Sequence, residues 1–480
     1  MRIKIILYIL VLLVPVKGFS QLFNPDNKYS SQQLAEDYDY LVDALEKSHP
    51  GLYWYTDSVG FKGLSGFIAE TITLSDSLTE TEFLRKARLL NFAIRCVHTS
   101  IGFSKAHDAW WKQNALLLPF NLFTANGKYY VYQNYSENPL LDFGNEILTI
   151  DNKPINDIIT RISPYIPSDG FNSSRRKNVL KTGFHYYYSL AINETSPTYK
   201  ISCVTSGTKD TAVLTVKGIN YNELNNRRSS LKKSTTPIDL RFIDSLNAAV
   251  LKVPTFRKDL FEKEGLDYDQ VLDSFFNVLK ARKTSNLVID MRDNGGGMSE
   301  YGAVLLSYLT NTAFVYCKNQ WLTSDTHFDF IEYDIPETFK GFPEGIVTED
   351  NGYKWKKHSI LGIRQPAKNR FKGNIYFIIN GGCSSTTAEV IALAKANNIG
   401  VAIGEEMGGT NEGNTSGITG WVTLPHTKAV VRIPMVKFEL ATENNTAVLP
   451  DFYIQPTIED ALNGIDKEMD FTLELIKQKK

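Results

Sequence analysis

The chain has little cysteine and almost no excess of charge, and each shortage excludes a class of protein. Its 480 residues contain four cysteines, too few for a disulfide framework to stabilise a chain of this length. The 52 lysines and arginines nearly balance the 53 aspartates and glutamates, and this balance argues against nucleic acid as a partner. No pair of histidines or cysteines has the spacing of zinc ligands, so we expect neither a metal nor a cofactor.

Long apolar runs are missing after the N-terminus. Arg2 and Lys4 precede an apolar run from Ile5 to Val16, and small residues follow it. This pattern is typical of a secretory signal peptide, because the run is shorter than the roughly 20 residues that a bilayer-spanning helix needs. We therefore expect residues 1–20 to be a signal peptide. The protein is then exported to a periplasm or secreted, with no stable membrane insertion once the signal is removed.

The hydrophobic pattern divides the rest of the chain into three regions. Residues 21–112 carry apolar side chains at three- and four-residue spacing, which predicts a helical region. Residues 113–225 switch to a period of two, which predicts a small β module with one or two helices. Residues 226–480 alternate helices with continuous apolar strands, which predicts a mostly parallel sheet covered on both faces.

Local signals refine this division. Pro50 should end the first helix, and the stretch from Thr79 to Leu90 starts a second helix with a Thr-x-x-Glu cap. Asp151-Asn152 is interpreted as a tight turn between two strands. The polar stretch from Asn220 to Asp239 is interpreted as a linker or a mobile loop.

Two glycine-rich junctions follow buried strands in the last region, where α/β sheets carry their chemistry. The first, residues 290–297, has the sequence DMRDNGGG. Its three glycines expose backbone N–H groups that can hold an anion or an oxyanion, or they merely make a flexible connection. The Gly-Lys-Ser/Thr of a phosphate-binding Walker loop is missing.

The second junction, NGGCSSTTAE at residues 380–389, places a cluster of hydroxyls at the start of a helix. Each of Ser384, Ser385, Thr386 and Thr387 can be a plain N-cap, the commoner role at such a position. A serine there can also be a nucleophile, because the next N–H can hold an oxyanion. Cys383 is a rival nucleophile with no better claim.

A serine nucleophile needs a base, and the chain offers seven histidines. His98 lies at the end of the helical region in an apolar, β-prone setting. A lone histidine of this kind is more often structural, so the residues around it leave both roles open.

Taken in order, these motifs resemble the C-terminal processing (tail-specific) family of serine peptidases, and within it the tricorn-like branch. The resemblance rests on IDMRDNGGG, NGGCSSTTAE, VAIGEEMGG, LPDFYIQPTIEDALNGID and a His98-Thr99 pair after a helical region containing His49-Pro50. It implies an α/β fold in which a crotonase-like (ClpP/crotonase) catalytic core, residues 226–480, follows a PDZ-like module, residues 113–225. That module shows no Gly-Leu-Gly-Phe loop for a substrate carboxylate.

The resemblance also implies which residues act. Typical members activate the serine with a lysine, but the matching stretch, residues 404–413, contains none. The tricorn-like branch uses a histidine, which matches His98, and a distant glutamate, for which Glu443 is the candidate. The serine that precedes this histidine in the branch is Val97 here.

The branch's Ser-x-x-x-Glu pattern, counted back from Glu389, selects Ser385 as the nucleophile. A Ser-x-x-Glu spacing would select Thr386, which is a poor nucleophile away from a chain terminus. The expected oxyanion donors are the N–H of Thr386 and that of Gly295 or Gly296.

We therefore expect an exported serine endopeptidase that hydrolyses peptides or proteins through an acyl-enzyme on Ser385, with His98 as base. One alternative is a catalytically decayed member that binds a peptide or an apolar ligand. Another is a cell-envelope interaction module that acts through the PDZ-like segment. If His98 approaches Ser385, then Cys96 and Cys383, each two residues upstream, lie where a disulfide can form.

Overall fold

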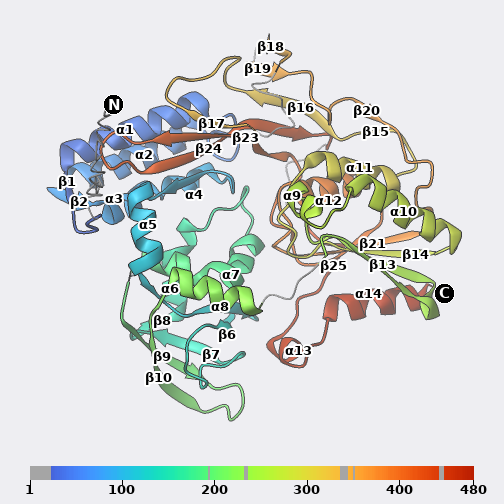
Figure 1. The fold of residues 1–480 in the computed structure, drawn as a ribbon, viewed down its shortest axis with the longest axis horizontal. Helices are drawn as coiled ribbons and strands as arrows, with labels where there is room; N and C mark the ends of the chain where they lie inside the picture. Colours follow the sequence, from blue (N-terminus) through green and yellow to red (C-terminus); the bar gives the residue numbers. More distant parts are fainter. Residues whose placement is uncertain are drawn as a thin grey trace, which may run out of the picture.

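The computed structural model of the chain describes residues 23–192, 195–231, 236–335, 344–349, 352–442 and 448–479. The expected signal peptide and Glu443 lie outside these ranges. Figure 1 shows the N-terminal helices and the β module on one side of the molecule and the parallel sheet on the other. No helix of the described ranges is long and apolar enough to cross a membrane.

The N-terminal region is helical, as its periodicity predicts. Its helices are α1 (Ser31–Ser48), α2 (Ser58–Thr73), α3 (Glu80–Ala87), α4 (Leu90–Ile94) and α5 (Lys105–Asn114). Thr79 caps α3 in a capping box with Glu82, so the predicted cap is confirmed. Strands β1 (Lys28–Ser30) and β2 (Ser77–Thr79) pair antiparallel and join the starts of two helices.

The second region is a β module with its own hydrophobic core. Its sheet has the order β10-β9-β7-β6-β5, with β8 beside β7. The elements are β5 (Phe120–Ala125), β6 (Lys128–Asn134), β7 (Glu146–Ile150), β8 (Lys153–Pro154), α6 (Ile155–Ile162), η1 (Ser163–Tyr165), α7 (Ser174–Ala191), β9 (Thr198–Val204) and β10 (Thr211–Lys217). Asp151 and Asn152 both have positive φ, which confirms the tight turn between β7 and β8.

The linker predicted from Asn220 to Asp239 is wrong over its first half. This segment forms helix α8 (Tyr221–Leu231), and the Asn220 side chain accepts the N–H of Glu223 at 2.8 Å. The helix buries one large apolar side chain, Leu224, against Ile219 and Tyr135. A single buried leucine leaves no amphipathic stripe in the sequence, so the polar composition suggested a loop.

The third region contains the predicted parallel sheet, with the order β12-β13-β14-β21-β22-β25. Its strands are β12 (Asp239–Ile243), β13 (Ala248–Lys252), β14 (Asn286–Asp290), β21 (Asn374–Ile379), β22 (Val401–Gly404) and β25 (Phe452–Tyr453). Every neighbouring pair is parallel except β12 with β13. The carboxyl ends of β14 and β21 therefore lie side by side, and the two glycine-rich junctions follow them.

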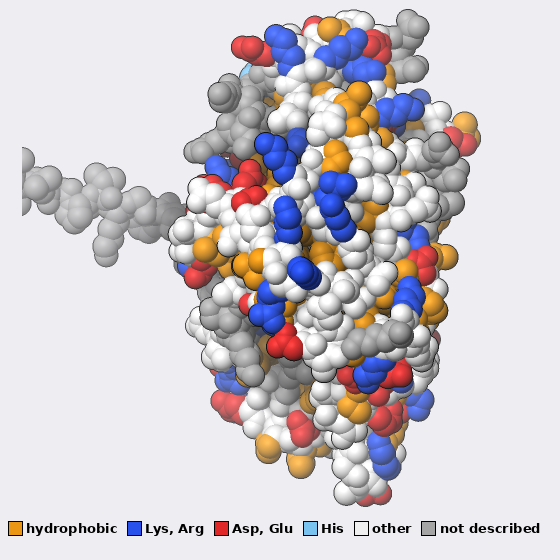
Figure 2. Space-filling view, turned by 90° about the vertical axis from the view of Figure 1, so that its right-hand side faces the viewer, with side chains coloured by type: hydrophobic (Ala, Val, Ile, Leu, Met, Phe, Trp, Pro, Cys, Tyr) orange, Lys and Arg blue, Asp and Glu red, His pale blue; other side chains and the backbone are white. Residues whose placement is uncertain are grey.

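Helices cover both faces of this sheet, as the continuous apolar strands predict. On one face Leu251 and Ile289 pack in the core shared by α10 (Tyr268–Ala281), α11 (Ser299–Leu309) and α12 (Thr386–Ala396). On the other face Val250 and Val288 pack with α14 (Lys467–Gln478). Lys, Arg, Asp and Glu side chains are interspersed on the face of the molecule in Figure 2, in keeping with the balanced charge.

A second large sheet connects the N-terminal helices to the parallel sheet. Its order is β17-β23-β24-β16-β19-β18, and β3 (Ser100–Gly102) also pairs with β24. The other strands are β16 (Cys317–Leu322), β17 (Glu332–Asp334), β18 (Ile346–Glu349), β19 (Gly352–Trp355), β23 (Gly413–Thr423) and β24 (Val430–Leu440). Arg432 of β24 pairs with Ser100, so this register brings the residues just before β3 beside β24.

Short elements complete the described fold. They are β4 (Leu116–Leu117) paired with β11 (Ile219–Asn220), β15 (Phe314–Val315) paired with β20 (Ile363–Arg364), and the helices α9 (Lys258–Lys263), η2 (Asp244–Leu246) and α13 (Ile458–Leu462).

Candidate active site

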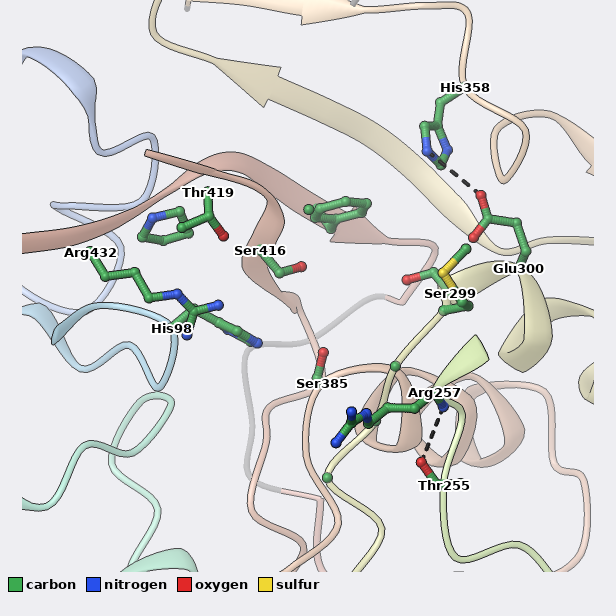
Figure 3. A pocket seen from close by; sticks show the side chains of 17 residues that line it. His98, Thr255, Arg257, Ser299, Glu300, His358, Ser385, Ser416, Thr419 and Arg432 are labelled. Atoms are coloured by element: carbon green, nitrogen blue, oxygen red, sulfur yellow. Dashed lines mark hydrogen bonds and ion pairs between the residues drawn. The ribbon is translucent and has the colours of Figure 1, made fainter. Parts of the chain in front are cut away.

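A pocket of about 390 Å³ opens where the glycine-rich junctions meet the second sheet. Its lining includes the predicted nucleophile Ser385 and the predicted base His98, although the two lie 287 positions apart in the sequence. Arg432 of β24 and Arg257, which follows β13, line the same pocket. Figure 3 shows Ser385 near the centre, with His98 and Arg432 on one side and Glu300 and His358 on the other.

Ser385 stands in a strained turn directly before α12. Its φ is 54° and its ψ is −130°, a conformation that a residue with a side chain rarely adopts. Its side chain makes no capping hydrogen bond to α12, so the plain N-cap role is not the one observed. The hydroxyl points into the pocket in Figure 3. A strained strand-to-helix turn of this kind presents a serine hydroxyl to a substrate.

The turn is held against the first glycine-rich junction. Thr386 Oγ1 donates to the carbonyl of Gly297 at 2.9 Å, and the Ser384 N–H donates to the carbonyl of Asn294 at 3.2 Å. Gly296 has φ +96°, and a Cβ at this residue would lie 2.7 Å from the Ser385 Cβ. The glycine is therefore needed both for its backbone conformation and for the close approach of the nucleophile turn.

Some backbone N–H groups around Ser385 already donate to protein acceptors, and others are available to bind an oxyanion. The N–H of Gly296 donates to Asn294 Oδ1 at 2.9 Å inside its own loop, so it is not free for an oxyanion. Within the described ranges, the N–H groups of Thr386, Gly295 and Gly297 meet no protein acceptor. The structure thus retains two of the three predicted donors and adds Gly297.

Glu389, the glutamate of the Ser-x-x-x-Glu pattern, anchors helix α12 next to the nucleophile. This buried carboxylate accepts from the Tyr316 hydroxyl at 2.9 Å and from Asn414 Nδ2 at 2.8 Å. Burial raises its pKa above the ordinary value. Because Asn414 belongs to β23, the glutamate connects the nucleophile helix to the second sheet.

His98 reaches the pocket from the segment before β3, and in Figure 3 its ring points across the pocket toward the Ser385 hydroxyl. Although both residues are described, no hydrogen bond joins the two side chains in this structure. Burial, together with the nearby Arg432 and Arg175, lowers the pKa of His98 to about 3. The imidazole is therefore neutral at pH 7, the state that a general base requires.

The residues on either side of this histidine are held by buried polar side chains. The Val97 N–H donates to Asp169 Oδ1 at 2.9 Å. His49 Nδ1 accepts the Gly51 N–H at 3.1 Å, so its Nε2 carries the proton and donates to Thr99 Oγ1 at 2.8 Å. Burial lowers the pKa of His49 to about 4, which keeps it in this neutral form. The loop that carries His98, here called the base loop, is thus fixed by hydrogen bonds at Val97 and at Thr99.

The disulfide considered between Cys96 and Cys383 does not form. Both thiols are free and buried, and each has another polar neighbour. Cys96 Sγ lies 2.8 Å from Thr415 Oγ1, and Cys383 Sγ donates to the carbonyl of Met291 at 3.1 Å. Although each cysteine lies two residues before a site residue and both belong to one core, each sulfur contacts a different polar group.

Cys96, His98 and Asp169 form a group of metal-ligand type in the described part of the chain. Their candidate ligand atoms lie within 4.8 Å of one another. The sequence spacing did not indicate this group, since Asp169 comes from the β module. Asp169 already accepts the Val97 N–H and Cys96 already contacts a threonine, so two of the three groups have roles that need no ion.

Sequence reasoning missed three charged residues near the pocket: Arg432, Arg257 and Asp169. None of them lies in a glycine-rich junction or beside a predicted site residue in sequence. The pairing of β3 with β24 brings Arg432 to the site, and only the docking of the β module brings Asp169. Glu443, the predicted acid partner of the base, lies outside the described residues.

Comparisons with known proteins give a family match for part of the chain and a shared fold. Residues 247–454 match the model of Peptidase family S41. Mature CPAF complexed with lactacystin has a similar fold, with a TM-score of 0.67 at 14% identity over 93% of this chain and 98% of that one. Mature CPAF alone gives a TM-score of 0.64 at 13% identity over the same shares, 93% and 98%. No curated protein sequence matches the chain. Over residues 247–454 the chain resembles Peptidase family S41, which makes it a serine-type peptidase, and the CPAF structures show its fold.

Proposed function

We propose that this chain is an exported serine endopeptidase that cleaves peptides or proteins through an acyl-enzyme on Ser385, with His98 as the general base. The observation that carries the proposal is the strained turn of Ser385. Its hydroxyl makes no capping bond and faces a pocket that also contains a neutral histidine and available backbone N–H groups. The strain is costly, so the surrounding contacts maintain a conformation that serves chemistry better than stability.

The mechanism follows from these positions. His98 takes the proton of the Ser385 hydroxyl while the oxygen attacks the scissile carbonyl carbon. The N–H of Thr386, with that of Gly297 or Gly295, then stabilises the negative charge on the former carbonyl oxygen. The imidazolium returns its proton to the leaving amine, and a water molecule repeats the cycle to release the acyl group.

The finer assignments are proposals as well. A parallel sheet with helices on both faces and the nucleophile at a helix start supports the crotonase-like core. Sheet β10-β9-β7-β6-β5 with α6 and α7 supports the PDZ-like module. A histidine in the site, with no lysine in residues 404–413, supports the tricorn-like branch over a Ser–Lys mechanism. The apolar run near the N-terminus supports export.

The direct test is labelling with a serine-directed phosphonate probe, together with hydrolysis of casein. We expect the wild type to be labelled and the Ser385→Ala variant to lose labelling and at least about 10⁴-fold of its hydrolysis rate. Ser384→Ala is the matched control, because this adjacent hydroxyl only approaches the carbonyl of Gly295 at 3.4 Å. Full labelling of Ser385→Ala would contradict the assignment. A binding-only protein would instead hold peptides equally well with and without Ser385 and hydrolyse none.

A further inference from the structure

A buried carboxylate from the β module lies beside the base. Asp169 stands between η1 and α7, and only 2% of its surface is exposed. Its Oδ1 accepts the Val97 N–H at 2.9 Å, but its Oδ2 is buried with no hydrogen-bond partner among the described residues. An unpaired buried carboxylate oxygen is costly, so it calls for a partner that this resting structure does not supply.

The matching unpaired atom belongs to His98. Its Nδ1 is also buried without a hydrogen-bond partner in the described part of the chain. A ring nitrogen of His98 and a carboxylate oxygen of Asp169 lie within 4.8 Å of each other. This separation exceeds a direct hydrogen bond, so the imidazole must rotate, or a water molecule must bridge the two groups, before Nδ1–H can interact with the carboxylate.

The charges around the base favour such a partner, although a backbone hydrogen bond at Thr415 already raises the pKa of His98 in part. When His98 takes the Ser385 proton it becomes an imidazolium, and Arg432 and Arg175 both disfavour that positive charge. The other titratable neighbours offer no counter-charge. Burial holds the pKa of His49 at about 4, so it is neutral, and raises the pKa of the Cys96 thiol to about 11.

Asp169 can supply that counter-charge at neutral pH. Burial raises its pKa to about 6, while the Val97 N–H and Arg175 lower it in part. The buried Tyr55 hydroxyl beside it has a raised pKa and stays neutral. Asp169 is therefore an anion at pH 7 and above, close to the ring that becomes a cation during the reaction.

We propose that Asp169 is the positioning residue of the Ser385–His98 pair: it fixes the base loop through Val97 and accepts a hydrogen bond from His98 Nδ1–H when the ring is protonated. This inference rests on the proposed function. The Ser385 proton moves to Nε2 and later to the leaving amine, while the Nδ1 proton stays on the ring and Asp169 stays ionised. The β module thus contributes a side chain to the chemistry of another region.

The test compares Asp169→Asn with Asp169→Glu and with Asp37→Asn. Asp37 is a matched buried carboxylate that accepts the His426 N–H at 2.7 Å and the Thr427 N–H at 2.8 Å. We expect Asp169→Asn to lower kcat by about 10²- to 10⁴-fold with little change in KM, and Asp169→Glu to recover part of the loss. Asp37→Asn should change stability and leave kcat within about threefold.

The pH profile separates positioning from a purely structural role. In the wild type, kcat should fall as the pH drops through about 6, where Asp169 takes up a proton. This acid limb should disappear in Asp169→Asn and persist in Asp37→Asn. Glu443→Gln tests the acid predicted from sequence. If Glu443→Gln removes the limb while Asp169→Asn keeps it and the wild-type kcat, the proposal is overturned.

A readout independent of activity separates this inference from the proposed function. In a Ser385→Ala background, NMR of the labelled imidazole of His98 should show a lower pKa and a changed Nδ1–H signal on adding Asp169→Asn. Identical spectra would refute the positioning role even if the enzyme proves active. Loss of wild-type activity on adding EDTA would also overturn it, because Cys96, His98 and Asp169 would then be ligands of an ion.

Discussion

The Ser385 turn and the His98 loop meet in one pocket, but they are built in different ways. The Ser385 turn is made from two junctions that follow neighbouring parallel strands, β14 and β21, so the sheet itself places them together. The His98 loop follows no strand of that sheet. Its partners come from separate parts of the chain: α1's C-terminal end supplies His49, the β module supplies Asp169, and β23 supplies Thr415.

This difference shows how one site can combine a fixed backbone geometry with side chains from distant parts of the chain. The nucleophile turn depends on backbone conformation, on glycine and on N–H groups that any sequence with the same φ and ψ would present. The loop that carries His98 depends on individual buried polar side chains, among them His49, which bonds Thr99, and Asp169, which accepts the Val97 N–H. We therefore expect the Ser385 turn to be disrupted when a Cβ is added, and the His98 loop to be disrupted when a polar atom is removed.

The largest effect is expected at the backbone of the nucleophile turn. In Gly296→Ala the new Cβ would lie 2.7 Å from the Ser385 Cβ at a φ of +96°, so the turn must move. We expect kcat to fall by at least about 10²-fold, because a displacement near 1 Å is enough for such a loss. Steady-state hydrolysis of a peptide substrate measures it.

Gly295→Ala is the matched control for this prediction. A Cβ at Gly295 meets no atom within 4 Å, and its φ is not positive. Its N–H remains in place as a candidate oxyanion donor. We expect kcat within about threefold of wild type. Equal losses in the two variants would show that the close approach of Gly296 to Ser385 does not control the turn.

A smaller effect is expected from a polar atom of the base loop. Thr99→Val removes the Oγ1 that accepts from His49 Nε2 at 2.8 Å and leaves a buried donor without an acceptor. We expect the free energy of unfolding to fall by about 1–3 kcal/mol. Urea denaturation measures it. Thr160→Val, which removes an exposed hydroxyl from α6, should stay within about 0.5 kcal/mol, and a similar loss there would contradict the argument.

The smallest effect is a change in how stability depends on pH. Burial lowers the pKa of His49 to about 4, below its ordinary 6.5. Between these values the unfolded chain binds more protons at this residue than the folded one, so stability is lost as the pH falls below 6.5. His49→Gln should reduce this slope by roughly 1 kcal/mol per pH unit between pH 6 and 4.5.

Thr99→Val provides the comparison for the slope. It breaks the same hydrogen bond without removing a titratable group, so its loss of stability should be nearly the same at pH 6 and at pH 4.5. The measurement is urea denaturation at both values. Parallel pH curves for His49→Gln and the wild type would exclude this histidine as a source of acid sensitivity.

The predictions from sequence succeeded where structure depends on neighbours along the chain. The capping box at Thr79, the turn at Asp151-Asn152 and the parallel strands are all encoded by residues a few positions apart. One prediction from sequence was wrong, because the polar segment after Asn220 is a helix that packs through one leucine. The sequence left open whether Cys96 and Cys383 pair, and in the structure both thiols are free.

The sequence by itself determined the parallel sheet, the glycines that follow β14 and β21, and the cluster of hydroxyls that starts α12. Periodicity and turn chemistry act over a few residues and can be recognised there. The tertiary structure alone decided that Ser385 faces the pocket instead of capping its helix and that Asp169 lies beside the base. Asp169 meets the loop of the base through Val97, which lies 72 positions away, and no local pattern encodes which distant polar groups will meet.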